Sequence, residues 1–128
     1  MQRQSLWAQV KNHAVAQLYP KVYTPAMIQV LRSDAFSKWL GGLKDKQATA
    51  RIAARIRSFE LGNSGDCKPV RWGVWELRVH HGAGYRIYYT RHGQMTYFLL
   101  IGGVKSTQQK DIDTAVLMAK EITKELKS

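Results

Sequence analysis

The sequence predicts one α+β domain, in which a helical hairpin packs on one face of a small antiparallel sheet. A further helix follows, and the helices are expected to cover one face of the sheet. Three observations indicate this fold: two short stretches with apolar residues at helical spacing, three strand-like stretches joined by glycine turns, and a final long helical stretch. A chain of 128 residues is long enough to bury one core without disulfides or metals. Its hydrophobic fraction of 45% is ordinary for a globular protein.

Residues 1–26 are predicted to lie outside this domain. The stretch 5–18 can form a short amphipathic helix that Pro20 and Pro25 would end, and residues 21–24 are expected to be a linker. The pattern of a compact domain begins at Met27, and residues 28–31 are expected to form its first strand. The domain is therefore predicted to span residues 27–128, and the stretch before it is either a loosely attached arm or a start-site artefact.

Two helices, joined tightly as an antiparallel hairpin, are expected next. Ser33 or Asp34 can cap the first, in which positions 36, 39, 40 and 43 are apolar. Asp45 can cap the second, and Gly62-Asn63 can end it. The apolar stripe of the second helix comprises Ala48, Ile52, Ile56 and Phe59.

Three consecutive strands follow, and an antiparallel meander is the expected pairing because each is joined to the next by a short turn. The strand-like stretches are residues 68–80, 84–92 and 95–106, with turns at Gly82-Ala83-Gly84 and His92-Gly93. Ser106 or Thr107 is expected to cap the last helix. The apolar positions of that helix are Ile112, Ala115, Val116, Ala119, Ile122 and Leu126.

The balance of charge is strongly basic. Twenty Lys and Arg against nine Asp and Glu give a formal net charge of +11, which favours a nucleic-acid, ribosomal or acidic-protein partner. In two of the strands, polar and aromatic side chains alternate with the apolar stripe and share the opposite face. These side chains are Arg78, His80, Arg86 and Tyr88. A sheet face with converging cations is expected to bind a polyanion, and phosphate is the obvious one.

Several classes of site and location are excluded or disfavoured. Cys67 is the only cysteine, so the chain can form no internal disulfide and no cysteine-based zinc cluster, which favours a reducing, cytoplasmic location. The apolar runs are too short to span a membrane, and no signal peptide is evident. Histidines and carboxylates lack the spacing of a metal site, and Gly102-Gly103 lacks the flanking pattern of a nucleotide-binding loop. We therefore expect neither a metal nor a cofactor.

Four stretches together resemble the RelE/ParE toxin superfamily, and in particular its HigB-like "addiction module killer" branch. They are AFSKWLGGLKD, RIAARI, GNSGDCKPVRWGVWELRVHHGAGYRIYY and LLIGGVKSTQQKDI, and the resemblance runs from Met27 to about Leu126. It implies a RelE-like fold and a type II toxin that cleaves mRNA on the ribosome without a metal. The implied partners are a cognate antitoxin, the ribosome and mRNA, with operator DNA bound only through the antitoxin.

The resemblance also implies roles for individual residues. Arg86 matches the arginine that grips the scissile phosphate, and Lys105 occupies the place of the residue that protonates the leaving oxygen. Arg78, with Lys68 and Arg71 upstream, would complete the phosphate cradle or supply the general base, and the sequence does not decide which. Arginine suits the charge role because its planar fork contacts two phosphate oxygens at once.

Two further residues are expected to contact RNA. The aromatic residue that stacks on the mRNA base in RelE has no match near Asp111, and Tyr88 is the candidate to replace it because it shares a strand face with Arg86. His80 shares that strand parity as well and is a candidate for acid–base chemistry or RNA contact.

Each candidate also has a structural interpretation. Glu76 and Arg78 lie two residues apart on one strand face and could form an ion pair. Arg86 could be a solvated edge arginine, and Lys105 a surface lysine before a helix. His80 precedes a glycine turn, where a histidine is commonly just exposed.

Two other functions fit the same fold. One is a ParE-like inhibitor of DNA gyrase, although the joint presence of Arg86 and Lys105 argues against it, since an inhibitor that only binds protein would not need both. The other is a non-catalytic protein that binds nucleic acid through its basic charge and exposed aromatics.

Overall fold

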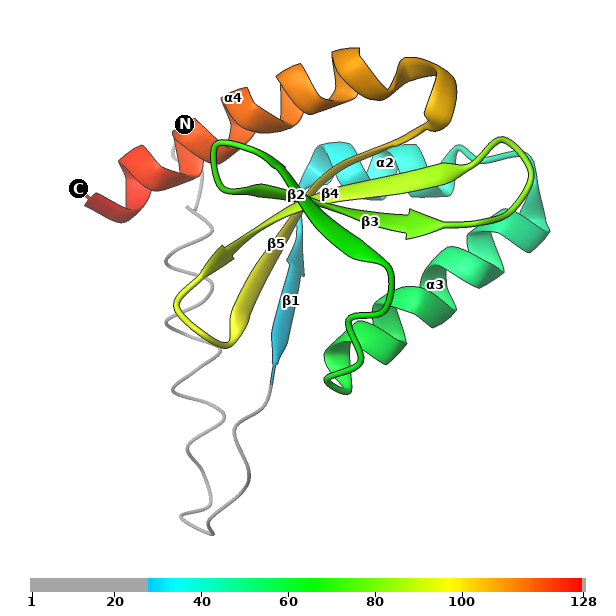
Figure 1. Cartoon of the computed structure of the whole chain (residues 1–128), viewed down its shortest axis with the longest axis horizontal. Helices are drawn as coiled ribbons and strands as arrows, with labels where there is room; N and C mark the ends of the chain where they lie inside the picture. The colour runs from blue at the N-terminus through cyan, green and yellow to red at the C-terminus, as the bar shows by residue number, and fades with distance from the viewer. Residues whose placement is uncertain (1–27, 128) are drawn as a thin grey trace, which may run out of the picture.

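The computed structural model describes residues 28–127, which form a sheet with helices on both of its faces (Figure 1). The elements in chain order are β1 (Gln29–Arg32), α2 (Asp34–Gly41), α3 (Lys46–Glu60), β2 (Cys67–Arg71), β3 (Val74–Val79), β4 (Tyr85–His92), β5 (Thr96–Val104), the 3₁₀ turn η1 (Lys105–Thr107) and α4 (Gln108–Lys127). The α+β class predicted from the sequence is confirmed. The predicted helix at 5–18 and the linker at 21–24 lie outside the described residues.

The sheet has five strands in the order β1-β5-β4-β3-β2 and is mixed. Strands β2 to β5 form the predicted antiparallel meander, but β1 pairs with β5 in parallel, with Gln29 opposite Thr96. The prediction of a purely antiparallel sheet was therefore wrong. Parallel neighbours need a long connection between them. Here α2, α3 and the strands β2, β3 and β4 separate β1 from β5 along the chain, which is long enough for the two strands to run in the same direction.

The stretch 68–80, predicted as one strand, is a hairpin of β2 and β3. Trp72 and Gly73 have φ values of +51° and +74°, and two successive residues with positive φ reverse a chain between antiparallel strands. A tryptophan rarely adopts positive φ, so the turn was not recognised. Pro69 fits this arrangement because β2 is an edge strand, where a missing N–H is tolerated.

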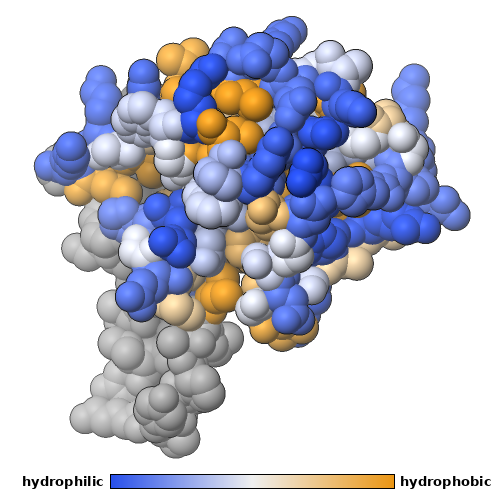
Figure 2. Space-filling model, viewed as in Figure 1, coloured by the Kyte–Doolittle hydropathy of each residue, from blue (hydrophilic) through white to orange (hydrophobic). Residues whose placement is uncertain are grey.

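Both faces of the sheet carry a buried cluster. Helices α2 and α3 cover one face, and α4 crosses the other (Figure 1). In β5 the consecutive residues Phe98, Leu99 and Leu100 are all buried, because alternate side chains enter opposite clusters. The expectation that helices cover only one face was therefore wrong, and the cationic face lies partly under α4. Figure 2 shows hydrophilic residues over most of the visible surface, with smaller apolar areas between them.

The predicted caps of the hairpin helices are confirmed. Ser33 Oγ accepts a hydrogen bond from the Phe36 amide at 2.9 Å, and Asp45 Oδ1 accepts one from the Ala48 amide at 3.1 Å. The last helix begins differently from the prediction, through η1 and without a side-chain cap. The Thr107 hydroxyl instead donates to Asp111 Oδ2 at 2.5 Å, within the first turn.

Gly102 and Gly103 allow helices to approach the end of β5 from both faces. A Cβ atom on Gly102 would lie 2.2 Å from the Trp39 ring in α2, and one on Gly103 would lie 1.9 Å from an Asp111 oxygen in α4. The two glycines therefore serve close packing, and they fix the strand end from which Lys105 follows. Among the described residues, no helix is both long and apolar enough to cross a membrane.

Candidate active site

An open groove of about 530 Å³ lies where the end of β3, the β3–β4 turn, the start of β4 and the end of β5 meet. Its lining is basic and rich in glycine. The lining residues are Arg78, His80, His81, Gly82, Ala83, Gly84, Arg86 and Lys105. The groove therefore brings together Arg78, His80, Arg86 and Lys105 from the predicted set.

Arg86 and Arg78 lie directly opposite each other on β4 and β3. Two like charges at opposed positions repel, so the pair needs compensation. Arg86 is compensated by Glu76, whose Oε2 lies 3.4 Å from Arg86 Nε, and Arg86 Nη1 donates to the Gly84 carbonyl at 3.1 Å. The Arg86 side chain is only 11% exposed, so its charge is poorly screened by water.

Glu76 was predicted only as a neighbour of Arg78, but it is fully buried beneath α4. Within residues 28–127, Glu76 is the charged residue among the buried side chains. Its Oε2 accepts a hydrogen bond from Gln108 Nε2 at 2.6 Å, so the first turn of α4 contacts the same carboxylate as Arg86. A buried carboxylate requires such partners, and Arg86 supplies the balancing charge.

Tyr88 lies opposite Glu76 on the sheet and has no exposed surface. Burial, and then the nearby Glu76 charge, raise the pKa of its hydroxyl. Its ring belongs to the cluster under α4. Tyr88 therefore offers no surface on which an RNA base could stack in this structure, and the predicted contact is not supported by its position.

Arg78 is held by Asp66, a residue that the sequence reasoning missed. Asp66 Oδ1 accepts from Arg78 Nη2 at 2.8 Å and from Nε at 3.2 Å, while Asp66 Oδ2 lies 2.5 Å from His80 Nε2. The bond to His80, followed by that to Arg78, lowers the pKa of the Asp66 carboxyl. The ion pair considered between Glu76 and Arg78 is absent from the structure. Recognition of the β2–β3 hairpin would have revealed Asp66, because the register places it opposite Arg78.

His81 joins the β3–β4 turn to the start of α3. His81 Nε2 lies 3.1 Å from Asp45 Oδ2, so the cap residue of α3 also binds the turn. Its ring stacks near Tyr85, and its side chain is 18% exposed. The Ala48 amide, and then the His81 interaction, lower the pKa of the Asp45 carboxyl.

Lys105 begins η1 and is exposed. Its backbone amide lies 3.4 Å from the Ala83 carbonyl, which joins the end of β5 to the β3–β4 turn. Gly84 has a φ of +78°, and a Cβ atom there would lie 3.4 Å from the Lys105 Cβ. The Lys105 ammonium forms no hydrogen bond or ion pair with any residue in the range 28–127, so its charge is available to a ligand.

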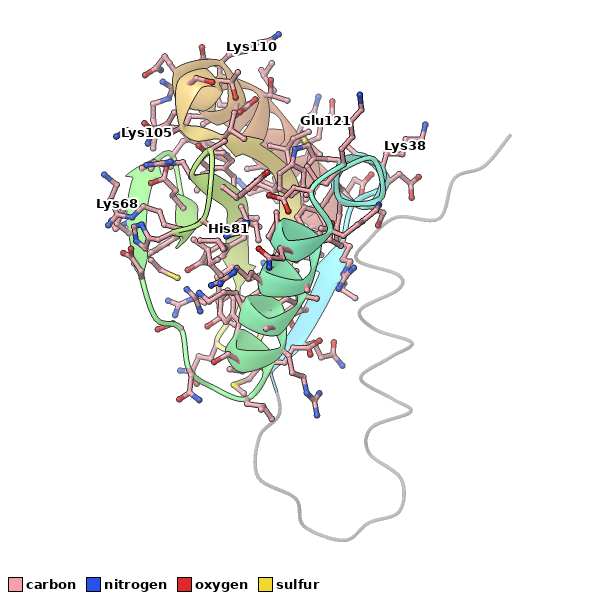
Figure 3. All side chains as sticks on the ribbon, turned by 90° about the vertical axis from the view of Figure 1, so that its right-hand side faces the viewer. Lys38, Lys68, His81, Lys105, Lys110 and Glu121 are labelled. Atoms are coloured by element: carbon pink, nitrogen blue, oxygen red, sulfur yellow. The ribbon has the colours of Figure 1, made fainter. Side chains whose placement is uncertain are left out.

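Lys68 and Arg71 do not line the groove. Lys68 is exposed and lies opposite Glu76 on the edge strand, and Figure 3 shows it on the same side of the molecule as Lys105. Arg71 forms an ion pair with Asp113 of α4. Lys68 can therefore extend the basic surface beside the groove, whereas Arg71 is engaged with the helix.

No three His, Cys, Asp or Glu side chains within the described residues come together as a group that could hold a metal ion. Asp66 and His80 form a pair, and the second oxygen of Asp66 accepts from Arg78, which cannot bind a metal ion.

Comparison with known proteins places the groove within a family domain. A family model described as "Phage derived protein Gp49-like (DUF891)" matches residues 38–124. The chain belongs to the Gp49-like family. An uncharacterized protein of Haemophilus influenzae is 45% identical to this Gp49-like chain over 95 residues, which cover 74% of the chain and 96% of that protein. The family match includes every residue that lines the groove.

Proposed function

We propose that this Gp49-like protein is the toxin of a type II toxin–antitoxin system and that it cleaves mRNA on the ribosome without a metal. The observation that supports this proposal is the convergence of Arg86, Lys105 and Arg78 on one open groove. Family membership agrees with it, since the Gp49-like family is related to RelE and HigB toxins in general. The formal charge of +11 favours association with a polyanion as large as a ribosome.

The reaction places three demands on the groove. The 2′-oxygen of one nucleotide attacks the adjacent phosphorus, charge develops on the phosphoryl oxygens, and the bond to the 5′-oxygen breaks. Arg86 suits the second demand because Glu76 and the Gly84 carbonyl fix its guanidinium before substrate arrives. Preorganised charge at a poorly solvated position is worth more than the same charge in water.

Lys105 and Arg78 supply the remaining charges. Lys105 has an unpaired ammonium within the described part of the chain, so it can donate a proton to the departing 5′-oxygen. Arg78 is held on two of its nitrogens by Asp66, which fixes the plane of its guanidinium at the groove wall. A phosphate oxygen would then meet two arginines whose directions are set by the protein, and a lysine whose ammonium is unpaired within residues 28–127.

An antitoxin is the proposed protein partner. An acidic segment laid over the groove would complement its cations and exclude mRNA. Operator DNA would then be bound through the antitoxin rather than through this chain alone.

The direct test is primer extension on a defined mRNA, with and without programmed ribosomes. Wild type, Lys105→Ala and Lys110→Ala are compared, because Lys110 is an exposed lysine of α4 outside the groove (Figure 3). We expect cleavage only with ribosomes, retained in Lys110→Ala and lost in Lys105→Ala. If wild type leaves the mRNA intact on ribosomes, the nuclease proposal is wrong, and DNA breakage by inhibited gyrase is the next activity to measure.

A further inference from the structure

The groove contains a candidate for the group that takes the proton from the attacking 2′-hydroxyl, and this inference depends on the proposed function. Arg78 is unsuited to that task, because an arginine guanidinium stays protonated in proteins and both of its bound nitrogens donate to Asp66. Glu76 and Tyr88 are fully buried and have no access to RNA. Lys105 is already assigned the opposite task, the donation of a proton.

The two carboxylates beside the groove are also poor candidates. Asp66 uses both of its oxygens to bind Arg78 and His80, and these bonds lower its pKa and therefore its basicity. Asp45 is bound to the Ala48 amide and to His81, with the same effect on its pKa. A general base must be able to accept a proton near neutral pH, and a carboxylate with a lowered pKa does so poorly.

Two histidines remain, and their surroundings differ. The His81 side chain is 18% exposed, stacks near Tyr85 and bonds to Asp45, which suits a structural role in holding the turn. The His80 side chain is 75% exposed and lines the same groove. Only one of its ring nitrogens, Nε2, is bound, at 2.5 Å from Asp66 Oδ2.

We propose that His80 is the general base of strand cleavage and that Asp66 is its positioning residue. When Nε2–H donates to Asp66, the neutral ring carries its lone pair on Nδ1, which faces no bonded group among residues 28–127. Nδ1 takes the 2′-hydroxyl proton, and the 2′-oxygen forms its bond to phosphorus. The bond from phosphorus to the 5′-oxygen breaks, and the 5′-oxygen takes a proton from Lys105. The products are a 2′,3′-cyclic phosphate and a 5′-hydroxyl.

The charges around His80 fit this cycle. Asp66 stabilises the imidazolium that forms, as a carboxylate does behind a catalytic histidine. Arg78 donates to the same carboxylate, so Asp66 binds both an arginine of the groove and the base. Asp66 thus ties a phosphate-binding arginine and the base into one rigid unit.

The test is the pH dependence of single-turnover cleavage of ribosome-bound mRNA. A protonated imidazole cannot act as a base, so the logarithm of the wild-type rate should fall with a slope of one as the pH is lowered far enough to protonate the base. His80→Ala should lower the rate by roughly 10²- to 10⁴-fold and remove this slope. Added imidazole should restore part of the rate. His92→Ala, at the far end of β4 and outside the groove, serves as the matched control and should behave as wild type.

The outcomes separate this inference from the function on which it depends. If wild type cleaves but His80→Ala keeps its rate and its pH slope, His80 is not the base, and the nuclease function stands. The assignment is also overturned if His80→Ala is slower but keeps the pH dependence of the wild-type rate and is not rescued by imidazole. His80 would then only help to position the substrate or its neighbours. If wild type fails to cleave on ribosomes, the proposed function and the base assignment fall together. Thermal melting of each variant confirms that the compared proteins are folded.

Discussion

Replacement of Arg86 by alanine should destabilise the protein as well as inactivate it. Glu76 is fully buried and balanced by Arg86 at 3.4 Å, with one hydrogen bond from Gln108 at 2.6 Å. Removal of one partner of a buried ion pair leaves an uncompensated charge and costs about 3–5 kcal/mol. Small domains are stable by only about 5–15 kcal/mol, so Arg86→Ala should lose a large share of its free energy of unfolding. Equilibrium urea denaturation measures this loss.

The double variant Glu76→Gln/Arg86→Ala is the necessary companion. Glutamine removes the buried charge and retains an oxygen that Gln108 can reach, so the double variant should be more stable than Arg86→Ala alone. If Arg86 also grips the phosphate, the double variant should be folded and still unable to cleave mRNA. A loss below about 1 kcal/mol in Arg86→Ala would show that Arg86 does not balance the Glu76 charge and would refute this reasoning.

Three further predictions concern separate parts of the molecule. Lys105→Ala should change the free energy of unfolding by no more than about 0.5 kcal/mol in urea denaturation, because the Lys105 ammonium has no partner within residues 28–127, and a larger loss would reveal a structural role. Gly102→Ala should lower stability by about 1–3 kcal/mol, since its Cβ would lie 2.2 Å from the Trp39 ring; an unchanged melting temperature would contradict this packing. The lowered pKa of Asp45, due chiefly to the Ala48 amide, contributes stability that is present above an unfolded-state pKa of about 3.9 and is lost as the pH falls through the folded-state pKa. Asp45→Asn should therefore show a weaker fall in stability below about pH 4, and an unaltered fall would exclude this contribution.

Within residues 28–127, local signals predicted the helices and most turns correctly. Ser33 and Asp45 were identified as caps because a short polar side chain before an amphipathic run satisfies free amide groups. The glycine turn at 82–84 and the turn at Gly93 were found because such residues tolerate positive φ. Helix caps and glycine turns depend on residues only a few positions apart, so the local sequence is enough to locate them.

Long-range pairing and an unusual turn residue account for what was missed. The parallel pairing of β1 with β5 joins residues 29–32 to residues 96–99, and no local pattern specifies that register. Trp72 occupies a turn position that Asn, Asp or Gly usually takes, so residues 68–80 looked like one strand. The error hid Asp66, because only the hairpin places it opposite Arg78.

The alternation of side chains along the strands correctly predicted that the two arginines of the groove lie on one sheet face. Alternate residues of a strand share a face, so Arg78 and Arg86 were expected together, and the structure pairs them directly. Parity alone could not show that α4 covers the inner part of this face. Tyr88 and Glu76 are fully buried, whereas Arg78 and Arg86 line the groove.

The acidic residues of this basic chain explain how the groove holds its cations in place. Glu76 binds Arg86, Asp66 binds Arg78 and His80, and Asp45 binds His81, so these groove side chains each have a carboxylate partner. A carboxylate lowers the net charge of a phosphate site, but it also fixes the direction of the donor that it binds, and fixed donors lose less entropy when phosphate arrives. Lys105 differs, because it has no carboxylate partner within residues 28–127. The uncompensated charge of the groove is therefore concentrated at Lys105, where the departing oxygen of a bound RNA would need it.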